Sequence, residues 1–338
     1  MTSRPQPTPP SPTPDEPLLP GAGSAGAGAG RSGGESSGGG NPDAGESRGD
    51  ERARSLISLL VDESPAVERV AARELVRADR SVLPLVLRAA RDDDPRLRGR
   101  ARAVLERRRF EERWRHLVAY LARPRVDLET GLLRLSALAP EGEDPRPTRR
   151  RLDRLARRVT RRRTRTDDDL AGAYELVEEI CNEHGFRGSE DDYHQPDNVW
   201  LHRALVRHRG LPLTLTAICM LVARRVGVRA TAVPLPGHVL LRLHAGRRSL
   251  LVDPFHGGAV RSRRECREYL AERGLPYRAE WFADADDRQL LRRQVWNLHR
   301  SFGDRGWTAR AARLRAAGGL LEGLRGPVTT ADTEGLGS

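Results

Sequence analysis

The sequence of 338 residues contains no lysine, only three cysteines and few aromatic side chains. Arginine therefore supplies all of the side-chain cations behind the formal net charge of +12. Such complete use of arginine is typical of a genome-wide codon bias, so we interpret the charge first as a solvated surface, with a nucleic-acid interface as the alternative. Because aromatic residues make up 4% of the chain, a stacking platform for single-stranded nucleic acid is poorly supplied.

The three cysteines, Cys181, Cys219 and Cys266, lie far apart in the sequence. Their spacing argues against a disulfide framework and against a zinc cluster, and it favours a reducing compartment. The N-terminal segment lacks the apolar stretch of a secretory signal, and no run of about 18 apolar residues indicates a membrane span. We therefore expect a soluble cytoplasmic protein with no membrane partner.

The first part of the chain divides into a low-complexity tail and a repeated helical segment. Residues 1–50 are rich in Pro, Gly, Ser and Ala, which predicts disorder. Within residues 51–111, "VDESPAVERVAARELV" from Val61 aligns with "RDDDPRLRGRARAVLE" from Arg91 at a period of 30. Each copy has acidic residues before a proline and then a helix with an apolar stripe. This segment resembles a short pair of HEAT-like repeats, which we expect to pack on the chain that follows.

The centre of the chain predicts a buried helix followed by three strands. Residues 213–226 are apolar almost all round, so this helix should be central, with Pro212 in its first turn and Gly227 at its end. The alternation then changes to a period of two. It predicts strands in the segments "ATAVPL", "HVLLRLHA" and "SLLVDPF".

The length of the last hairpin loop decides which side chains share a face. A loop of two or four residues pairs His244 with Ser249. One face then holds Val239, Leu241, Leu243, Leu250 and Val252 as the core face. The opposite face holds His238 diagonal to Asp253, within side-chain reach. A loop of three residues would break this parity.

A histidine and an aspartate beside the start of a buried helix suggest a site for nucleophilic catalysis. In such sites the carboxylate orients the imidazole, the imidazole acts as a base, and the nucleophile lies near the helix N-terminus. The first turn after Gly210 contains Thr214 but no cysteine. Cys219 falls in the helix interior, where we interpret it as a core residue.

Five segments in this order resemble the SirB1 family of transglutaminase-like proteins. They are "DYHQPDNVWLHRALVRHRGLPLTL", "VARRVGV", "PGHVLLRL", "DPFHGG" and "LLRRQVWNLHRSFGDRGW". The resemblance, over about residues 112–315, implies an α+β fold: a papain-like or transglutaminase-like core (112–275) of helices and a small antiparallel sheet, then a C-terminal helical region (276–325) and a flexible tail (326–338). It also implies the last two roles of a Cys-His-Asp triad for His238 and Asp253. Such proteins commonly have Ser or Thr in place of the cysteine, here Thr214.

These observations favour a binding or scaffold protein with a degenerate site, whose partner is another protein at the HEAT-like or core surface. A hydrolase or acyltransferase using Thr214, His238 and Asp253 is the first alternative, and it requires a Thr214 hydroxyl within about 3 Å of His238. A nucleic-acid-binding protein is the second, based on net charge and on "RRVTRRRTR".

Two smaller expectations concern polar residues near this segment. Asn198, or its neighbour Asp197, is predicted to cap the helix that follows, and contact of Asn198 with a substrate or ligand is the alternative. His184, His194 and His256 show no metal-ligand spacing with an acid or a thiol, so we predict no metal and no other cofactor.

Overall fold

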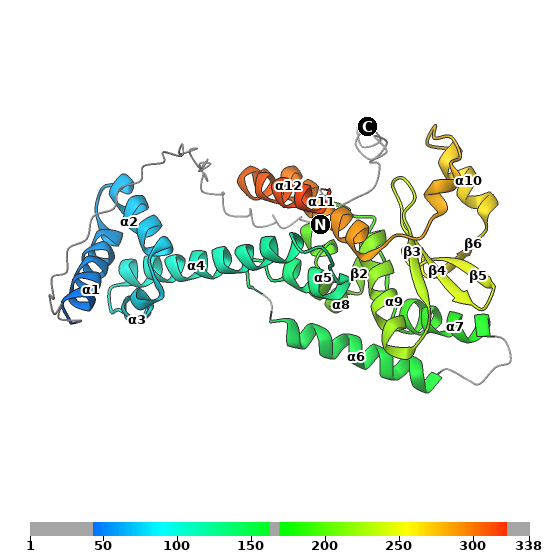
Figure 1. The fold of residues 1–338 in the computed structure, drawn as a ribbon, viewed down its shortest axis with the longest axis horizontal. Coiled ribbons are helices and arrows are strands. Elements are labelled where there is room, and N and C mark those ends of the chain that lie inside the picture. The colour runs from blue at the N-terminus through cyan, green and yellow to red at the C-terminus, as the bar shows by residue number, and fades with distance from the viewer. Residues whose placement is uncertain (1–42, 143, 163–168, 323–338) are drawn as a thin grey trace, which may run out of the picture.

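The computed structural model describes residues 43–142, 144–162 and 169–322 (Figure 1). Most of the segment predicted to be disordered, and the predicted C-terminal tail, lie outside the described residues. Helix α1 (Asp43–Ser58) nevertheless makes residues 43–50 helical, contrary to the sequence-based expectation. The described chain combines many helices with a four-stranded antiparallel sheet, which agrees with the predicted α+β class.

The N-terminal unit is a small group of helices with its own hydrophobic cluster. Pro65 and Pro95 each occupy the first turn of a helix, where a missing N–H costs no hydrogen bond. The Asp94 side chain caps the second of these helices by accepting a hydrogen bond of 2.8 Å from the Arg96 backbone N–H. The unit consists of α1, η1 (Leu59–Val61), α2 (Pro65–Arg77), η2 (Arg80–Val82), α3 (Leu83–Ala89) and the first half of α4 (Pro95–Leu121). Its buried residues are Ala53, Leu60, Ala71, Leu75, Val82, Val86, Ala89, Ala90, Ala101, Val104 and Leu105.

Helix α4 joins this unit to the rest of the molecule. It continues for 27 residues without a break, across the predicted boundary at 111–112. Its first half contributes Val104 and Leu105 to the N-terminal cluster, and its second half contributes Leu117 and Leu121 to the larger core. Figure 1 shows α4 as the rod between the two parts.

The larger core is built around α9 (Pro212–Val226). Every residue from Pro212 to Ala223 is buried, as the nearly continuous apolar pattern predicts. Pro212 occupies the first turn, and Gly227 ends the helix with a φ of 71°. The other helices of this part are α5 (Leu128–Ser136), α6 (Pro145–Arg162), α7 (Asp169–Val177), α8 (Leu201–Arg207), α10 (Arg263–Ala271), α11 (Asp287–Asp304) and α12 (Thr308–Glu322).

The sheet has the strand order β3-β4-β5-β6 with antiparallel neighbours. His244 lies opposite Ser249 and the hairpin loop has two residues, so the predicted register is confirmed. The fourth strand was not predicted. The strands are β3 (Ala230–Val233), β4 (Leu240–Ala245), β5 (Arg248–Asp253) and β6 (Ala259–Arg261). The short elements are η3 (Glu178–Glu183), β1 (Arg187–Gly188), η4 (Pro196–Asn198), β2 (Arg209–Gly210) and η5 (Ala279–Phe282).

The two faces of the sheet pack against different partners. The face that the sequence assigns to the core does join the cluster around α9: Val239, Leu241, Leu243 and Val252 are buried there, and Leu250 packs against it. The opposite face is also covered, because Leu240 and Leu251 pack with residues of α10 and η5. None of the described helices is both long and apolar enough to span a bilayer.

Candidate functional site

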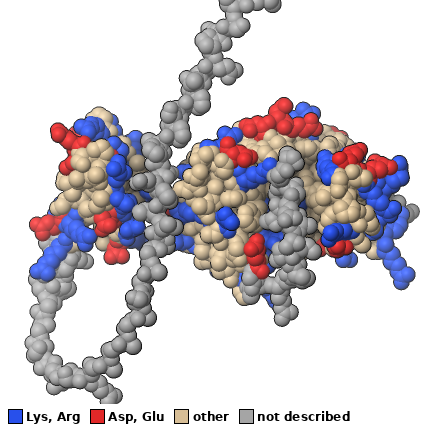
Figure 2. Space-filling model, turned by 90° about the horizontal axis from the view of Figure 1, so that it is seen from above, with Lys and Arg blue, Asp and Glu red and all other residues tan. Residues whose placement is uncertain are grey.

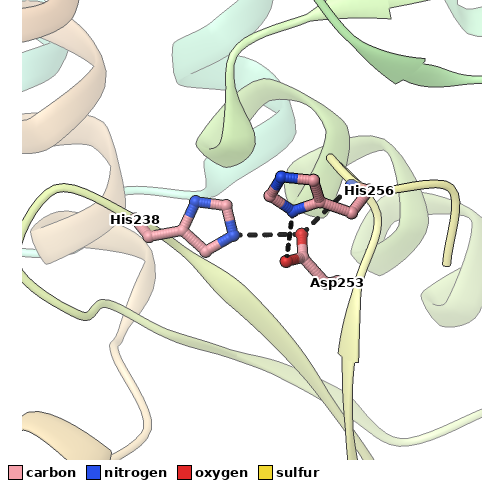
Figure 3. A group of neighbouring side chains, drawn as sticks. All are labelled: His238, Asp253 and His256. Atoms are coloured by element: carbon pink, nitrogen blue, oxygen red, sulfur yellow. Dashed lines mark hydrogen bonds and ion pairs between the residues drawn. The ribbon is translucent and has the colours of Figure 1, made fainter. Parts of the chain in front are cut away.

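His238 and Asp253 meet at one end of the β4–β5 hairpin. His238 lies just before β4, and Asp253 is the last residue of β5. The His238 Nε2 atom is 3.0 Å from Asp253 Oδ1, and both side chains are almost entirely buried (Figure 3). The His238 ring also stands edge-on to Phe255, with ring centroids 5.9 Å apart. The diagonal juxtaposition expected from the hairpin register is therefore present.

The turn after β5 adds a second histidine to the pair. His256 Nδ1 lies 2.7 Å from Asp253 Oδ2, and the backbone N–H groups of Phe255 and His256 donate to Asp253 Oδ1. The turn closes where the Gly258 backbone N–H donates to the Asp253 carbonyl at 2.8 Å. Gly258 has a φ of 84°, and a Cβ there would lie 2.6 Å from Val177 Cγ1. Only glycine fits this position without strain, so the turn is fixed on α7.

The carboxylate of Asp253 is the electrostatic centre of the site. Burial alone would raise its pKa, but the neighbouring His238 and His256 outweigh that effect and lower the pKa to about 2. The Arg261 guanidinium of β6 also lies beside this carboxylate, with Nε 3.4 Å from Oδ2. Asp253 is therefore held as a carboxylate, and it orients the groups around it.

The walls of the site come from α10 and from the loop before β4. The Tyr269 ring lies 5.8 Å from the His238 ring, and its hydroxyl donates to the Pro236 carbonyl at 3.3 Å. Burial raises the pKa of Tyr269, with a smaller contribution from the Asp253 charge. Cys266 of α10 is buried, and burial raises the pKa of its thiol. The raised pKa values keep both Tyr269 and Cys266 neutral at ordinary pH.

Thr214, the candidate nucleophile, does not join His238. Its side chain is 1% exposed and lies in the first turns of α9. The Thr214 hydroxyl accepts a hydrogen bond of 3.0 Å from Gln294 Nε2 of α11 and contacts the Val199 carbonyl at 3.5 Å. Within the described residues, it makes no hydrogen bond to His238. The hydroxyl is thus engaged inside the core.

The rotation of α9 explains why Thr214 faces away. The Thr216 hydroxyl donates to the carbonyl of Val239, the residue after His238, at 3.3 Å. Residues three apart share a helix face, so Leu213 lies one turn before Thr216 on the side toward the hairpin. Leu213 is 2% exposed and carries no nucleophilic atom. The helix therefore turns an alkyl group toward the hairpin.

Asn198 does not cap a helix, which corrects the sequence-based prediction. It ends η4, and Trp200 takes the N-cap position of α8. The Asn198 side chain instead donates to the carbonyls of Asp192 and Tyr193 and accepts a hydrogen bond of 3.0 Å from Arg207. The side chain is 0% exposed, and these three hydrogen bonds stabilise the loop before α8.

The cysteines lie where a core interpretation places them. Cys219 is 0% exposed in the middle of α9, next to Cys181. Contact with Cys181 and burial both raise the pKa of the Cys219 thiol. All three cysteines of the chain are buried and free.

Sequence reasoning missed His256 as a member of this site. It was assigned no metal-ligand spacing, yet it lies three residues after Asp253 in a tight turn. The spacing Asp-x-x-His followed by two glycines was the available signal, since glycines of positive φ allow the chain to fold back on the preceding carboxylate. His184 and His194 lie outside this cluster.

The fold and the His–Asp pair define a class of protein, the transglutaminase-like superfamily. The family model described as "Transglutaminase-like superfamily" matches residues 146–295, from the start of α6 into α11. No solved structure matches the chain significantly.

Within this class, the chain belongs to the family of the UPF0162 proteins. It is 31% identical over 191 residues to UPF0162 protein PA3419 of Pseudomonas aeruginosa, a match that covers 55% of this chain and 67% of that protein. It is 34% identical over 138 residues to a UPF0162 protein of Xylella fastidiosa, covering 38% of this chain and 48% of the relative. The chain thus spans about half the length of the Xylella relatives that it matches.

A human relative shares a shorter segment. F-box only protein 21 of Homo sapiens is 30% identical over 121 residues, which are 33% of this chain and 19% of that protein.

Proposed function

We propose that this protein is a non-catalytic, transglutaminase-like binding protein whose Cys-His-Asp site is degenerate. One observation carries the proposal: the Thr214 hydroxyl is buried and hydrogen bonded to Gln294, away from His238. A threonine hydroxyl is a weak nucleophile unless an adjacent base activates it. Without contact to His238, Thr214 has no such base.

The remaining thiols do not restore catalysis. Cys181 and Cys219 are buried together in the core, and burial raises the pKa of Cys266. Reactive cysteines need a lowered pKa and some exposure, because the thiolate is the nucleophile. In this proposal, the His238–Asp253 pair stabilises the end of the hairpin and shapes a surface.

A reactive acyl or amide probe tests the absence of covalent catalysis. Wild type, Thr214→Ala and His238→Ala should all show the same background labelling by intact-protein mass spectrometry. Thr216→Ala is the matched control, since it removes the other buried hydroxyl of α9. Labelling that disappears in Thr214→Ala and His238→Ala, but persists in Thr216→Ala, would instead support the acyl-transfer alternative.

The partner in this proposal is another protein, and the HEAT-like N-terminal unit is the preferred surface. Half of the large hydrophobic side chains that are exposed in the described residues lie between positions 59 and 87. Val67 and Val70 sit one helical turn apart on α2, so they share a face, and Leu87 is exposed on α3. Exposed apolar groups gathered in one unit favour a protein interface.

The charge distribution supports a nucleic-acid partner less well than a protein partner. Figure 2 shows arginine and acidic side chains interleaved on the visible face, over both parts of the molecule. Broad phosphate binding is favoured by a surface of one sign. Nucleic-acid binding therefore stays a prediction from net charge, and part of the basic segment behind it (residues 163–165) lies outside the described residues.

Affinity capture, followed by a binding assay with the purified partner, tests whether the protein has a protein partner. A partner recovered with wild type should be recovered equally with His238→Ala and lost with the double variant Val67→Glu and Val70→Glu. Leu320→Glu is the control, because Leu320 is an exposed hydrophobic residue on α12. Binding that persists in the α2 variant would place the partner elsewhere, and binding lost in His238→Ala would tie it to the site.

A further inference from the structure

We infer that His238, Asp253 and His256 bind one divalent transition-metal ion of the zinc class. The proposal goes beyond the binding role above and does not depend on it. Among the described residues, these three form the group whose ligand atoms converge, with all of them within 4.8 Å of one another. Figure 3 shows both imidazole rings facing the carboxylate.

The distances are close to those of a coordinated ion. His238 Nε2 is 3.0 Å from one carboxylate oxygen, and His256 Nδ1 is 2.7 Å from the other. Tetrahedral zinc with bonds of about 2.0–2.1 Å separates its ligand atoms by about 3.3 Å. The two nitrogen–oxygen distances lie below this spacing and all ligand atoms lie within 4.8 Å of one another, so the side chains must readjust around an ion but need no change of the backbone. The exposed ring of His256 can supply that movement, because its side chain is 48% exposed.

The buried nitrogen of His238 is a second and independent indication. Its side chain is 10% exposed, and Nε2 is shielded from solvent without a hydrogen-bond partner among the described residues. The atom is 3.0 Å from Asp253 Oδ1, close enough for an ion pair but without the geometry of a hydrogen bond. A buried polar atom without a hydrogen bond is costly, and a metal ion at the centre of the group would satisfy it.

The chemistry of the donors selects the ion. Two imidazoles and one carboxylate suit zinc and its neighbours, whereas calcium and magnesium prefer all-oxygen sites. The backbone N–H groups of Phe255 and His256 hold the carboxylate, as outer-shell contacts do in known sites. The Arg261 charge, with Nε 3.4 Å from Oδ2, opposes a cation and should weaken affinity. Three protein ligands also leave one tetrahedral position open to water.

Metal titration of the full-length, chelator-treated protein tests the site. We expect isothermal titration with Zn²⁺ to show one strong site per chain, and Co²⁺ to give visible absorption bands from that site. His256→Ala and His238→Ala should each weaken Zn²⁺ binding by at least about tenfold and abolish the Co²⁺ bands. The control is His116→Ala, which removes an exposed histidine of α4 and should change neither readout.

Because the His256 side chain is half exposed, its replacement by alanine should leave the fold intact, so weaker Zn²⁺ binding can be assigned to the lost ligand. Circular dichroism of the metal-free His256→Ala protein should match wild type, and Zn²⁺ should raise the melting temperature of wild type only. Absence of a strong site in wild type, or equal Zn²⁺ affinity in wild type and both site variants, would overturn the proposal. Neither result bears on the probe and capture experiments, so the two proposals fail separately.

Discussion

The two hydrophobic clusters of this molecule differ in kind as well as in size. In the N-terminal unit, every buried residue that the structure describes is apolar. In the larger core, buried polar and charged side chains occur throughout, among them Asn198, Thr214, His238, Asp253 and Gln294. A buried polar group destabilises the fold unless it is paired, so proteins keep such groups mainly where position matters. The comparison shows that buried polar groups, including the His238–Asp253 pair, are concentrated in the larger core.

The largest expected effect comes from matched cavities in the two clusters. Leu75→Ala in the N-terminal unit and Leu221→Ala in α9 each remove a side chain that is 0% exposed. Each should cost about 2–5 kcal/mol of unfolding free energy. Because the N-terminal cluster is small, Leu75→Ala should unfold the N-terminal unit while the larger core stays intact.

Two spectroscopic probes separate the clusters. All five tryptophans lie at position 114 or later, so tryptophan fluorescence in urea follows the larger core, while far-ultraviolet circular dichroism follows both parts. Leu75→Ala should shift only the dichroism transition, and Leu221→Ala should shift both. A common shift of both signals in Leu75→Ala would mean that the two clusters unfold as one cooperative unit.

A proline in α4 tests whether that helix holds the two parts together. Arg109 is exposed in the stretch between the clusters, so Arg109→Pro removes a helical hydrogen bond without disturbing a core. We expect a loss of about 3 kcal/mol and faster proteolysis within α4. Arg109→Ala should be nearly neutral. Equal proteolysis of the two variants would show that contacts outside α4 fix the N-terminal unit.

Acid offers a smaller effect that only the core should feel. The folded pKa of Asp253 is about 2, below the ordinary value of 3.8. The stabilisation is therefore present above pH 3.8 and is lost as pH falls from 3.8 through 2, with a magnitude of about 2 kcal/mol. The double variant His238→Ala and His256→Ala should lose less stability over this range in fluorescence-monitored unfolding. An identical acid dependence in both proteins would contradict the described electrostatics.

The sequence was most informative where periodicity alone decides the structure. The alternation of the strands and the two-residue loop predicted the pairing of His244 with Ser249, and with it the approach of His238 to Asp253. The apolar run from Pro212 predicted the buried α9 in the same way. These features depend on local patterns that a sequence displays directly.

Features set by tertiary packing were less accessible. Which residue of the first turn of α9 faces the hairpin depends on the rotation of the helix, so Thr214 could not be separated from Leu213. Asn198 was expected to cap a helix because asparagine favours N-cap positions. Its hydrogen bond to Arg207 depends on the folded loop and could not be predicted from the local sequence. Strand β6 is three residues long and gives no alternation to detect. The sequence analysis also placed a boundary at 111–112, inside α4, although no proline interrupts residues 96–123.

Because α4 is continuous, the orientation of the N-terminal unit relative to the larger core depends on the helical twist between them. Its 27 residues span about 40 Å at 1.5 Å per residue. Removing one residue from the exposed middle of this shaft would shorten it by only about 1.5 Å, yet it would swing everything beyond that point by about 100° around the axis. An insertion or deletion in this stretch should therefore be tolerated according to the rotation that it causes. A change close to a whole number of helical turns would keep the orientation of α2 relative to the larger core.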